Sequence, residues 1–280
     1  MNIPASELKK VAREKLLGNY SIVIGAAIVI NIMIRIVASI LSAPIEGFSI
    51  LKMLTHGISV PTLVLFYLAN LIIVFLSDIL NCGYTYVNYR IAQGKKTAVE
   101  DIFYVFSHNP FTVIKLFLIQ IGIAVLLCIP FTVGLVLLFT FVLSMDSLIN
   151  ILLAYSVFVI LILILMVLMD LLLFCCKFIY FENNDMPAFQ IVKQSMQLMK
   201  GNKGRLLYLK ISFIPIFLLS ILTFGIANLW LSPYKMVTEA NFYFSLFGKK
   251  PKAKPDWRPY ISNADFSNID NARYNPYNRF

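Results

Sequence analysis

Residues 6–41 read SELKKVAREKLLGNYSIVIGAAIVINIMIRIVASIL: a short basic segment, the pair Gly18-Asn19, and then an apolar run. Apolar residues of the first part recur at a spacing of three and four, at Leu8, Val11, Ala12 and Leu16. This period predicts an amphipathic helix over 6–18 that ends at Gly18-Asn19, where both residues tolerate a left-handed conformation. The apolar run over 20–41 has about the 20 residues that a helix needs to cross a bilayer.

The same order of segments recurs twice, at a period of about 90 residues. Ser107-His108-Asn109-Pro110 and Lys200-Gly201-Asn202 end the amphipathic segments 97–108 and 187–200, and two apolar stretches follow each. The six predicted spans are 20–41, 61–91, 111–144, 149–181, 206–222 and 226–247. We therefore expect an all-α polytopic membrane protein, with six transmembrane helices as three pseudo-repeated hairpins, each preceded by an amphipathic interfacial helix. Residues 1–247 form a single membrane domain in this interpretation.

Composition and charge agree with a membrane protein. Of the 280 residues 59% are hydrophobic and 14% are charged, which is too little polar surface for a soluble domain of this length. One set of loops and termini holds 18 of the 24 Lys and Arg residues, whereas the opposite loops hold only Lys52. The positive-inside rule then predicts a multi-pass protein of the cell membrane with both termini in the cytoplasm.

The net charge of +10 suggests a partner with negative charge. The basic residues form no groove-reading motif, so we expect anionic lipids of the cytoplasmic leaflet and no nucleic acid. The interfacial helices present their bases to lipid headgroups at Lys9, Lys10, Arg13, Lys193 and Lys200. The tail, 248–280, is basic and aromatic and is predicted to be a cytoplasmic surface extension.

Ionisable and polar side chains within the predicted spans are the candidate functional residues, because each charge costs about 2.5–3.5 kcal/mol at mid-span. The candidates are Asp78, Asn81, Asp170, Lys235 and Glu239. We expect a close carboxylate partner for Lys235, supplied by Asp78 or Asp170, as a contact that holds the bundle together. The alternative is a substrate or proton path.

Two further features concern such a path. Asp78, Asn81, Thr85 and Asn88 follow one another on a single face of the second predicted span, and this polar stripe could line a cavity. In the third predicted span Pro130 predicts a kink or a helix break, because proline removes a backbone hydrogen bond. In the third amphipathic helix, the predicted apolar face holds Phe189, Val192, Met196 and Met199.

Enzyme signatures are absent from the sequence. His56 and His108 lie in separate loops, which rules out a His-Glu-x-x-His zinc pair, and no Gly-x-Ser-x-Gly elbow or P-loop occurs. The four cysteines lie in apolar runs without metal-ligand spacing, and we interpret them as small buried hydrophobes. We therefore expect no catalytic residue, no metal site and no cofactor.

Two segments carry a resemblance to a known family. Residues 188–203 (AFQIVKQSMQLMKGNK) and 222–234 (LTFGIANLWLSPY) resemble hallmarks of a bacterial membrane family catalogued as domain of unknown function 975. The resemblance extends over about residues 6–247. It implies a polytopic membrane protein and supplies no catalytic residue or substrate. A more distant likeness, to membrane domains attached to some glycerophosphodiester phosphodiesterases, suggests lipid-related work by analogy.

Two classes of function follow from these patterns. The first is a non-enzymatic scaffold that binds lipid, or another membrane protein, at the cytoplasmic face. The second is a transporter or export component with a polar path near Asp78 and Asp170, since interrupted helices and internal repeats are frequent in transporters.

Overall fold

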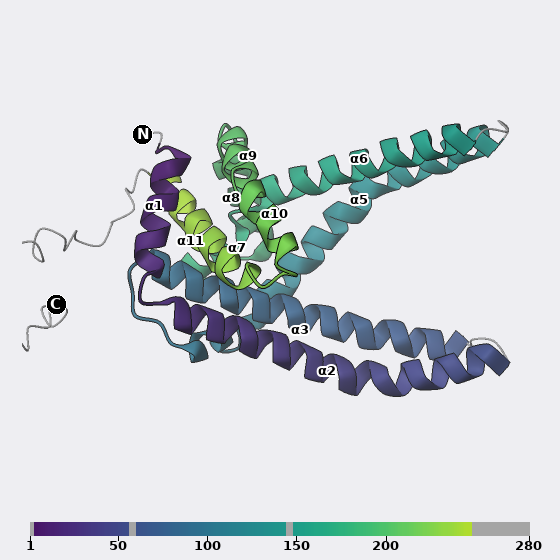
Figure 1. The fold of residues 1–280 in the computed structure, drawn as a ribbon, viewed down its shortest axis with the longest axis horizontal. Helices are drawn as coiled ribbons and strands as arrows, with labels where there is room; N and C mark the ends of the chain where they lie inside the picture. The colour runs from purple at the N-terminus through teal and green to yellow at the C-terminus, as the bar shows by residue number, and fades with distance from the viewer. Residues whose placement is uncertain (1–2, 56–59, 144–147, 248–280) are drawn as a thin grey trace, which may run out of the picture.

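The computed structural model describes residues 3–55, 60–143 and 148–247, and all regular structure in these ranges is helical. Figure 1 shows two long helical hairpins that leave a common base and diverge. The elements are α1 (Ala5–Leu16), α2 (Tyr20–Thr55), α3 (Val60–Ala92), η1 (Val99–Phe103), α4 (Tyr104–Ser107), α5 (Pro110–Leu143), α6 (Leu148–Leu173), α7 (Cys176–Glu182), α8 (Ala188–Met199), α9 (Lys203–Ile211), α10 (Ile214–Leu222) and α11 (Asn228–Leu246).

The long hairpins, α2–α3 and α5–α6 (Figure 1), are apolar, and many of their described side chains are apolar and exposed. Large exposed side chains such as Ile36, Leu68, Leu126 and Ile160 would be unfavourable in water over so wide a surface. The buried core lies instead at the base, where α1, α7, α8 and α11 pack. This distribution suits a protein whose hairpins are surrounded by lipid.

Four helical segments in the described ranges are long and apolar enough to cross a membrane: Tyr20–Leu41, Val64–Ala92, Val159–Glu182 and Lys203–Leu222. A fifth is possible if Val99–Ser107 and Pro110–Leu126, which meet at an angle of 83°, count as one span. The expected sixth span, 226–247, is not among them. Its helix, α11, carries Lys235, Glu239 and Asn241 and buries much of its surface in the base.

The predicted interruption at Pro130 does not divide its helix, since α5 is continuous from Pro110 to Leu143. A proline removes one backbone donor but keeps φ near the helical value, so a long apolar helix can continue through it. Interruptions occur in the next two predicted spans. The span 149–181 is divided at Phe174-Cys175, where Ser195 donates to the carbonyl of Leu172 at 2.9 Å.

The span 206–222 is divided at Ser212-Phe213, and Pro215 in the first turn of α10 accounts for this break, because it cannot donate to a preceding helical carbonyl. The chain then reverses between α10 and α11 at Phe224 and Gly225, with φ of 51° and 84°. Figure 1 shows this turn partway along α3, well short of the tips of the two long hairpins.

The three predicted amphipathic segments correspond to α1, η1–α4 and α8, and all three lie at the base. The segment that closes each one contains a residue with positive φ: Gly18 (84°), Asn109 (52°) and Gly201 (83°). The left-handed conformation turns the chain sharply from the short helix into the next apolar helix.

The apolar stripe of α1, and part of the apolar surface of α8, face protein. Leu8, Val11, Ala12 and Leu16 of α1 are buried in the core, with α11 as the main neighbour. In α8 the buried residues are Ala188, Ile191, Val192, Ser195 and Met199, whereas Phe189 and Met196 of the predicted face are exposed. The predicted face was right for Val192 and Met199 and wrong for Phe189 and Met196. The buried face is centred nearer Ile191, because α8 packs there against the α5–α6 hairpin and α7.

Candidate functional site

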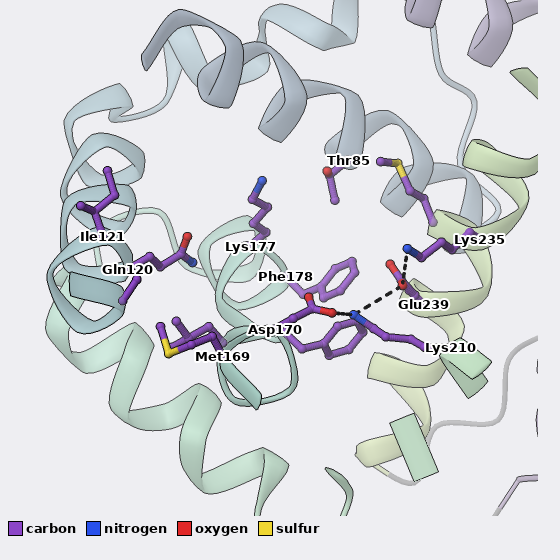
Figure 2. A pocket seen from close by; sticks show the side chains of 14 residues that line it. Thr85, Gln120, Ile121, Met169, Asp170, Lys177, Phe178, Lys210, Lys235 and Glu239 are labelled. Atoms are coloured by element: carbon purple, nitrogen blue, oxygen red, sulfur yellow. Dashed lines mark hydrogen bonds and ion pairs between the residues drawn. The ribbon is translucent and has the colours of Figure 1, made fainter. Parts of the chain in front are cut away.

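A cavity of about 520 Å³ opens where α3, α5, α9 and α11 meet the α6–α7 junction (Figure 2). Five ionisable side chains line it, and we name it the charged cavity: Asp170, Lys177, Lys210, Lys235 and Glu239. They come from four separate helices, so only the folded chain brings them together.

Lys210 is at the centre of the charge network. Its ammonium pairs with the carboxylate of Asp170 and lies 3.9 Å from Oε1 of Glu239. Lys235, one turn before Glu239 on α11, reaches the same oxygen at 3.9 Å. Figure 2 shows these four side chains as one chain of contacts from α6 across α9 to α11.

Lys177 enters the cavity from α7 and connects it to the first hairpin. Its Nζ lies 3.4 Å from Oδ1 of Asp78 on α3, and Asp78 itself does not line the cavity. The lining therefore holds three ammonium groups and two carboxylates. Figure 2 shows Lys177 and Gln120 projecting into the open space, with Thr85 on the facing helix.

The structure brings Asp170, Lys235 and Glu239 together in this cavity, with Asp78 beside it. It does not pair Lys235 with Asp78 or Asp170. The carboxylate partner of Lys235 is Glu239 on its own helix, whereas Asp170 and Asp78 pair with other lysines. Lys235 therefore has a close carboxylate partner, as expected, but neither Asp78 nor Asp170 supplies it, because these two pair with Lys177 and Lys210, which the expectation left aside.

Lys177 and Lys210 are the ionisable residues that the sequence interpretation missed. Both lie in predicted spans, so the argument that made Asp170 a candidate applies equally to them. Lys177 also follows Asp170 by seven residues, which places both on one face of a continuous helix. Because α6 and α7 are separated by a turn, that spacing alone does not fix their relative position.

The predicted polar stripe of α3 is divided between several environments. Thr85 lines the charged cavity, and Asn81 lines a second cavity. Asn88 is fully buried, donates to the carbonyl of Tyr84 at 2.8 Å and lies 3.5 Å from the sulfur of Met236. The stripe therefore does not form one continuous wall.

The remaining walls of the charged cavity are apolar. Phe174, Phe178, Met169 and Ile121 line it, and the Lys210 ammonium lies 5.5 Å from the centre of the Phe174 ring. Each lysine offers three N–H donors. Among the described residues, each ammonium pairs with only one or two carboxylates: Lys177 with Asp78, Lys210 with Asp170 and Glu239, and Lys235 with Glu239. The cavity therefore combines spare cationic donors with apolar walls, which suits an anionic group attached to an apolar one.

The interfacial bases do not all face outward. Lys10, Arg13, Lys193 and Lys200 are exposed, as expected for contact with headgroups. Lys9 instead donates to the carbonyl of Ser212 at 2.7 Å and lies 4.1 Å from the Phe213 ring centre. Burial lowers the pKa of Lys9. Lys9 thus connects α1 to the α9–α10 junction. Its position on the polar face of α1 did not predict this contact.

Metal-binding clusters of three or more His, Cys, Asp or Glu side chains do not occur in the part of the chain that the structure describes. Comparison with curated proteins gives no significant match, and neither does comparison with solved structures. The model of one family, described as "Protein of unknown function (DUF975)", matches residues 1–250. Because that match covers most of the chain, the protein belongs to this family.

Proposed function

We propose that this protein is a non-enzymatic integral membrane protein that binds an anionic phospholipid at the cytoplasmic face of the cell membrane, with the lipid headgroup in the charged cavity. The observation that carries the proposal is the convergence of Lys177, Lys210 and Lys235 on one cavity, whose lining includes two carboxylates and whose third carboxylate, Asp78, lies beside it as the partner of Lys177. A phosphate group supplies several acceptor oxygens, which match spare ammonium donors.

A lipid is favoured over a soluble anion by the surface that leads away from the cavity. Ile121 lines the cavity, and Val125, Ile129 and Val133 follow it at intervals of four residues along α5. All four side chains are exposed. They form an apolar ridge on one helix face, against which an acyl chain can lie while its headgroup occupies the cavity.

The orientation follows from the distribution of basic residues. Outside the tail, the segments rich in Lys and Arg are α1, the end of α3 with the segment after it, and α8 with the start of α9, and they lie at the base of the molecule (Figure 1). The charged cavity is lined by residues of α7, α9 and α11, which meet at the same end. The positive-inside rule assigns that end to the cytoplasm, where anionic lipids are concentrated. A transport function is less favoured, because Asp170 and Asp78, the acidic residues proposed for a path, are both engaged in ion pairs.

The test compares two double variants that remove equal charge. Lys177→Gln/Lys235→Gln alters the cavity and leaves the Lys210–Asp170 pair in place, whereas Lys193→Gln/Lys200→Gln alters exposed bases of α8 and its C-terminal end. Native mass spectrometry in mixed phosphatidylglycerol and phosphatidylcholine measures the lipid that each protein retains. We expect the cavity variant to lose its phosphatidylglycerol preference about tenfold and the α8 variant to keep most of it.

Two results would contradict the proposal. If both variants lose phosphatidylglycerol equally, binding depends on overall surface charge rather than on the cavity. If glycerol phosphate displaces the lipid completely at equal concentration, the site recognises a soluble phosphate and the apolar ridge contributes nothing.

A further inference from the structure

A second cavity, of about 260 Å³, lies between α2, α3 and α11, and we name it the amide cavity. Its polar lining consists of uncharged side chains: Asn31, Asn81, Tyr84, Asn228 and Ser232. No Lys, Arg, Asp or Glu is among its lining residues. Its chemistry therefore differs from that of the charged cavity.

The amide cavity opens to the side of a candidate membrane span, since its lining residues Asn31, Asn81 and Asn228 are exposed. Asn31 is at the middle of the candidate span Tyr20–Leu41, and Gly225, in the α10–α11 turn, lines the same cavity. Asn31 and Asn81 each donate one N–H to a carbonyl of their own helix, Ala27 at 2.8 Å and Ser77 at 2.7 Å. Each amide still has an oxygen and a second N–H, which are costly to leave unpaired in hydrocarbon.

Tyr84 adds a buried polar group to this lining. The side chain is 5% exposed, and its hydroxyl makes no hydrogen bond of good geometry to any described residue. The side chains of Ser232 and Asn88 lie within interaction distance of this hydroxyl but do not reach good hydrogen-bond geometry. A buried hydroxyl that lines a cavity and has only poorly aligned partners keeps hydrogen-bonding capacity for a polar occupant.

Met236 separates the two cavities, because it lines both. Thr85 of the charged cavity and Asn81 of the amide cavity lie one turn apart on α3, and the Thr85 hydroxyl donates to the Asn81 carbonyl at 2.8 Å. A methionine side chain is unbranched and changes rotamer easily. The polar surface thus continues from one cavity to the next past a flexible side chain.

We propose that the amide cavity is a second binding site, for water and a small uncharged amide- or hydroxyl-bearing solute, entered from the charged cavity past Met236. The absence of charge from its lining excludes ions as preferred ligands, and the carboxamides and hydroxyls offer both donors and acceptors. The volume accommodates several waters, at about 30 Å³ each, or one small solute. The ligand proposed here is argued from the lining of the amide cavity and does not rest on the phospholipid proposed for the charged cavity.

The test uses iodoacetamide, a small uncharged amide that alkylates thiolates, on the full-length protein in lipid nanodiscs. Ser232→Cys places a thiol in the amide cavity, and Ser39→Cys places one on the exposed surface of α2 within the same span as Asn31. A thiol ionises only where water reaches it. We expect the thiol at 232 to be alkylated at least tenfold faster than that at 39, as read by peptide mass spectrometry with the native cysteines in place.

The role of Met236 is tested in the same background. Met236→Ala should accelerate alkylation at 232 and Met236→Phe should slow it, with no effect at 39. Acetamide, an unreactive analogue of the reagent, should protect position 232. Three results would each overturn the proposal: equal alkylation rates at 232 and 39, an alkylation rate at 232 that is the same in all residue-236 variants, or a lack of protection by acetamide. Thermal unfolding of each variant identifies any that fails to fold, and Met236→Leu then replaces Met236→Phe as the bulk-retaining change.

Discussion

The ammonium of Lys15 in α1 donates to the side-chain oxygen of Asn241 in α11 at 3.1 Å, although both side chains are buried. The ammonium also donates to the carbonyl of Ala92 at the end of α3. Lys15 therefore joins three helices at the base without a carboxylate among these partners. Burial lowers the pKa of Lys15 to about 8.

This pKa predicts how stability changes with pH. The unfolded chain, with a lysine pKa of about 10.4, holds more protons than the folded chain between that value and the folded-state pKa. The free energy of unfolding should therefore rise as the pH increases from about 8 towards 10.4, and below pH 8 the full penalty of burying the charge is present.

Lys15→Met isolates this effect, because it keeps the length of the side chain and removes the titrating group. We expect the thermal midpoint of the wild type to rise relative to that of the variant between pH 7 and about 9.5. Differences are compared at each pH, so other titrating groups cancel. Parallel pH profiles for the two proteins would show that Lys15 keeps an ordinary pKa.

Gly83 permits a close contact between α3 and η1. A Cβ atom at this position would overlap the carbonyl of Ile102, which belongs to backbone and cannot move aside. Gly83→Ala should therefore lower the free energy of unfolding by about 1–3 kcal/mol, as overpacking does elsewhere. Thermal unfolding in detergent measures the change.

Gly122→Ala in α5 is the matched control, because a Cβ there meets no atom within 4 Å. The added methyl should be neutral or slightly stabilising, since alanine favours helix over glycine by up to about 1 kcal/mol. Equal destabilisation by both changes would mean that the two glycines affect stability through their backbone flexibility, and that the overlap with the Ile102 carbonyl contributes nothing.

The Lys210 network predicts an asymmetry between its members. Asp170→Asn leaves Lys210 beside Glu239, and the side chain of Asp170 is 58% exposed, so we expect a loss of about 1 kcal/mol or less. Lys210→Gln deprives both Asp170 and Glu239 of their shared cation, and Glu239, whose side chain is only 15% exposed, keeps Lys235 as its remaining partner. A larger loss than for Asp170→Asn is expected there, because two carboxylates lose a cation rather than one.

Chemical unfolding of the two single variants and of Asp170→Asn/Lys210→Gln completes a double-mutant cycle. The double variant should be less destabilised than the sum of the single ones, because the lost pair is replaced by neutral groups. Equal losses for the two single variants would show that Glu239 does not depend on Lys210.

Ser195 connects α8 to the break between α6 and α7. Its hydroxyl donates to the carbonyl of Leu172 at 2.9 Å, and the side chain is fully buried. Ser195→Ala leaves that carbonyl without its partner and should reduce the free energy of unfolding by about 1–3 kcal/mol. Ser6→Ala, at an exposed position of α1, should change it by less than about 0.5 kcal/mol in the same denaturation experiment.

The family assignment was predicted from residues 188–203 and 222–234, and the family model that matches residues 1–250 confirms it. An all-helical chain with several membrane-length helices was also predicted correctly, since apolar length is a local property of the chain. The number of spans was not confirmed. Hydropathy counts apolar residues in α11, but it does not show that this helix is largely covered by α1 and α3.

By itself the sequence determined which segments are helical, which are apolar and which charges lie among apolar residues, because these depend on neighbours along one helix. Only the tertiary structure decided the partners of those charges. Lys210 pairs with Asp170, 40 residues before it in the chain, and also contacts Glu239. Lys177 pairs with Asp78, 99 residues before it. Such distant contacts depend on the residue at which α6 ends and on the direction in which α9 runs. The periodicity of apolar residues along the chain predicts neither.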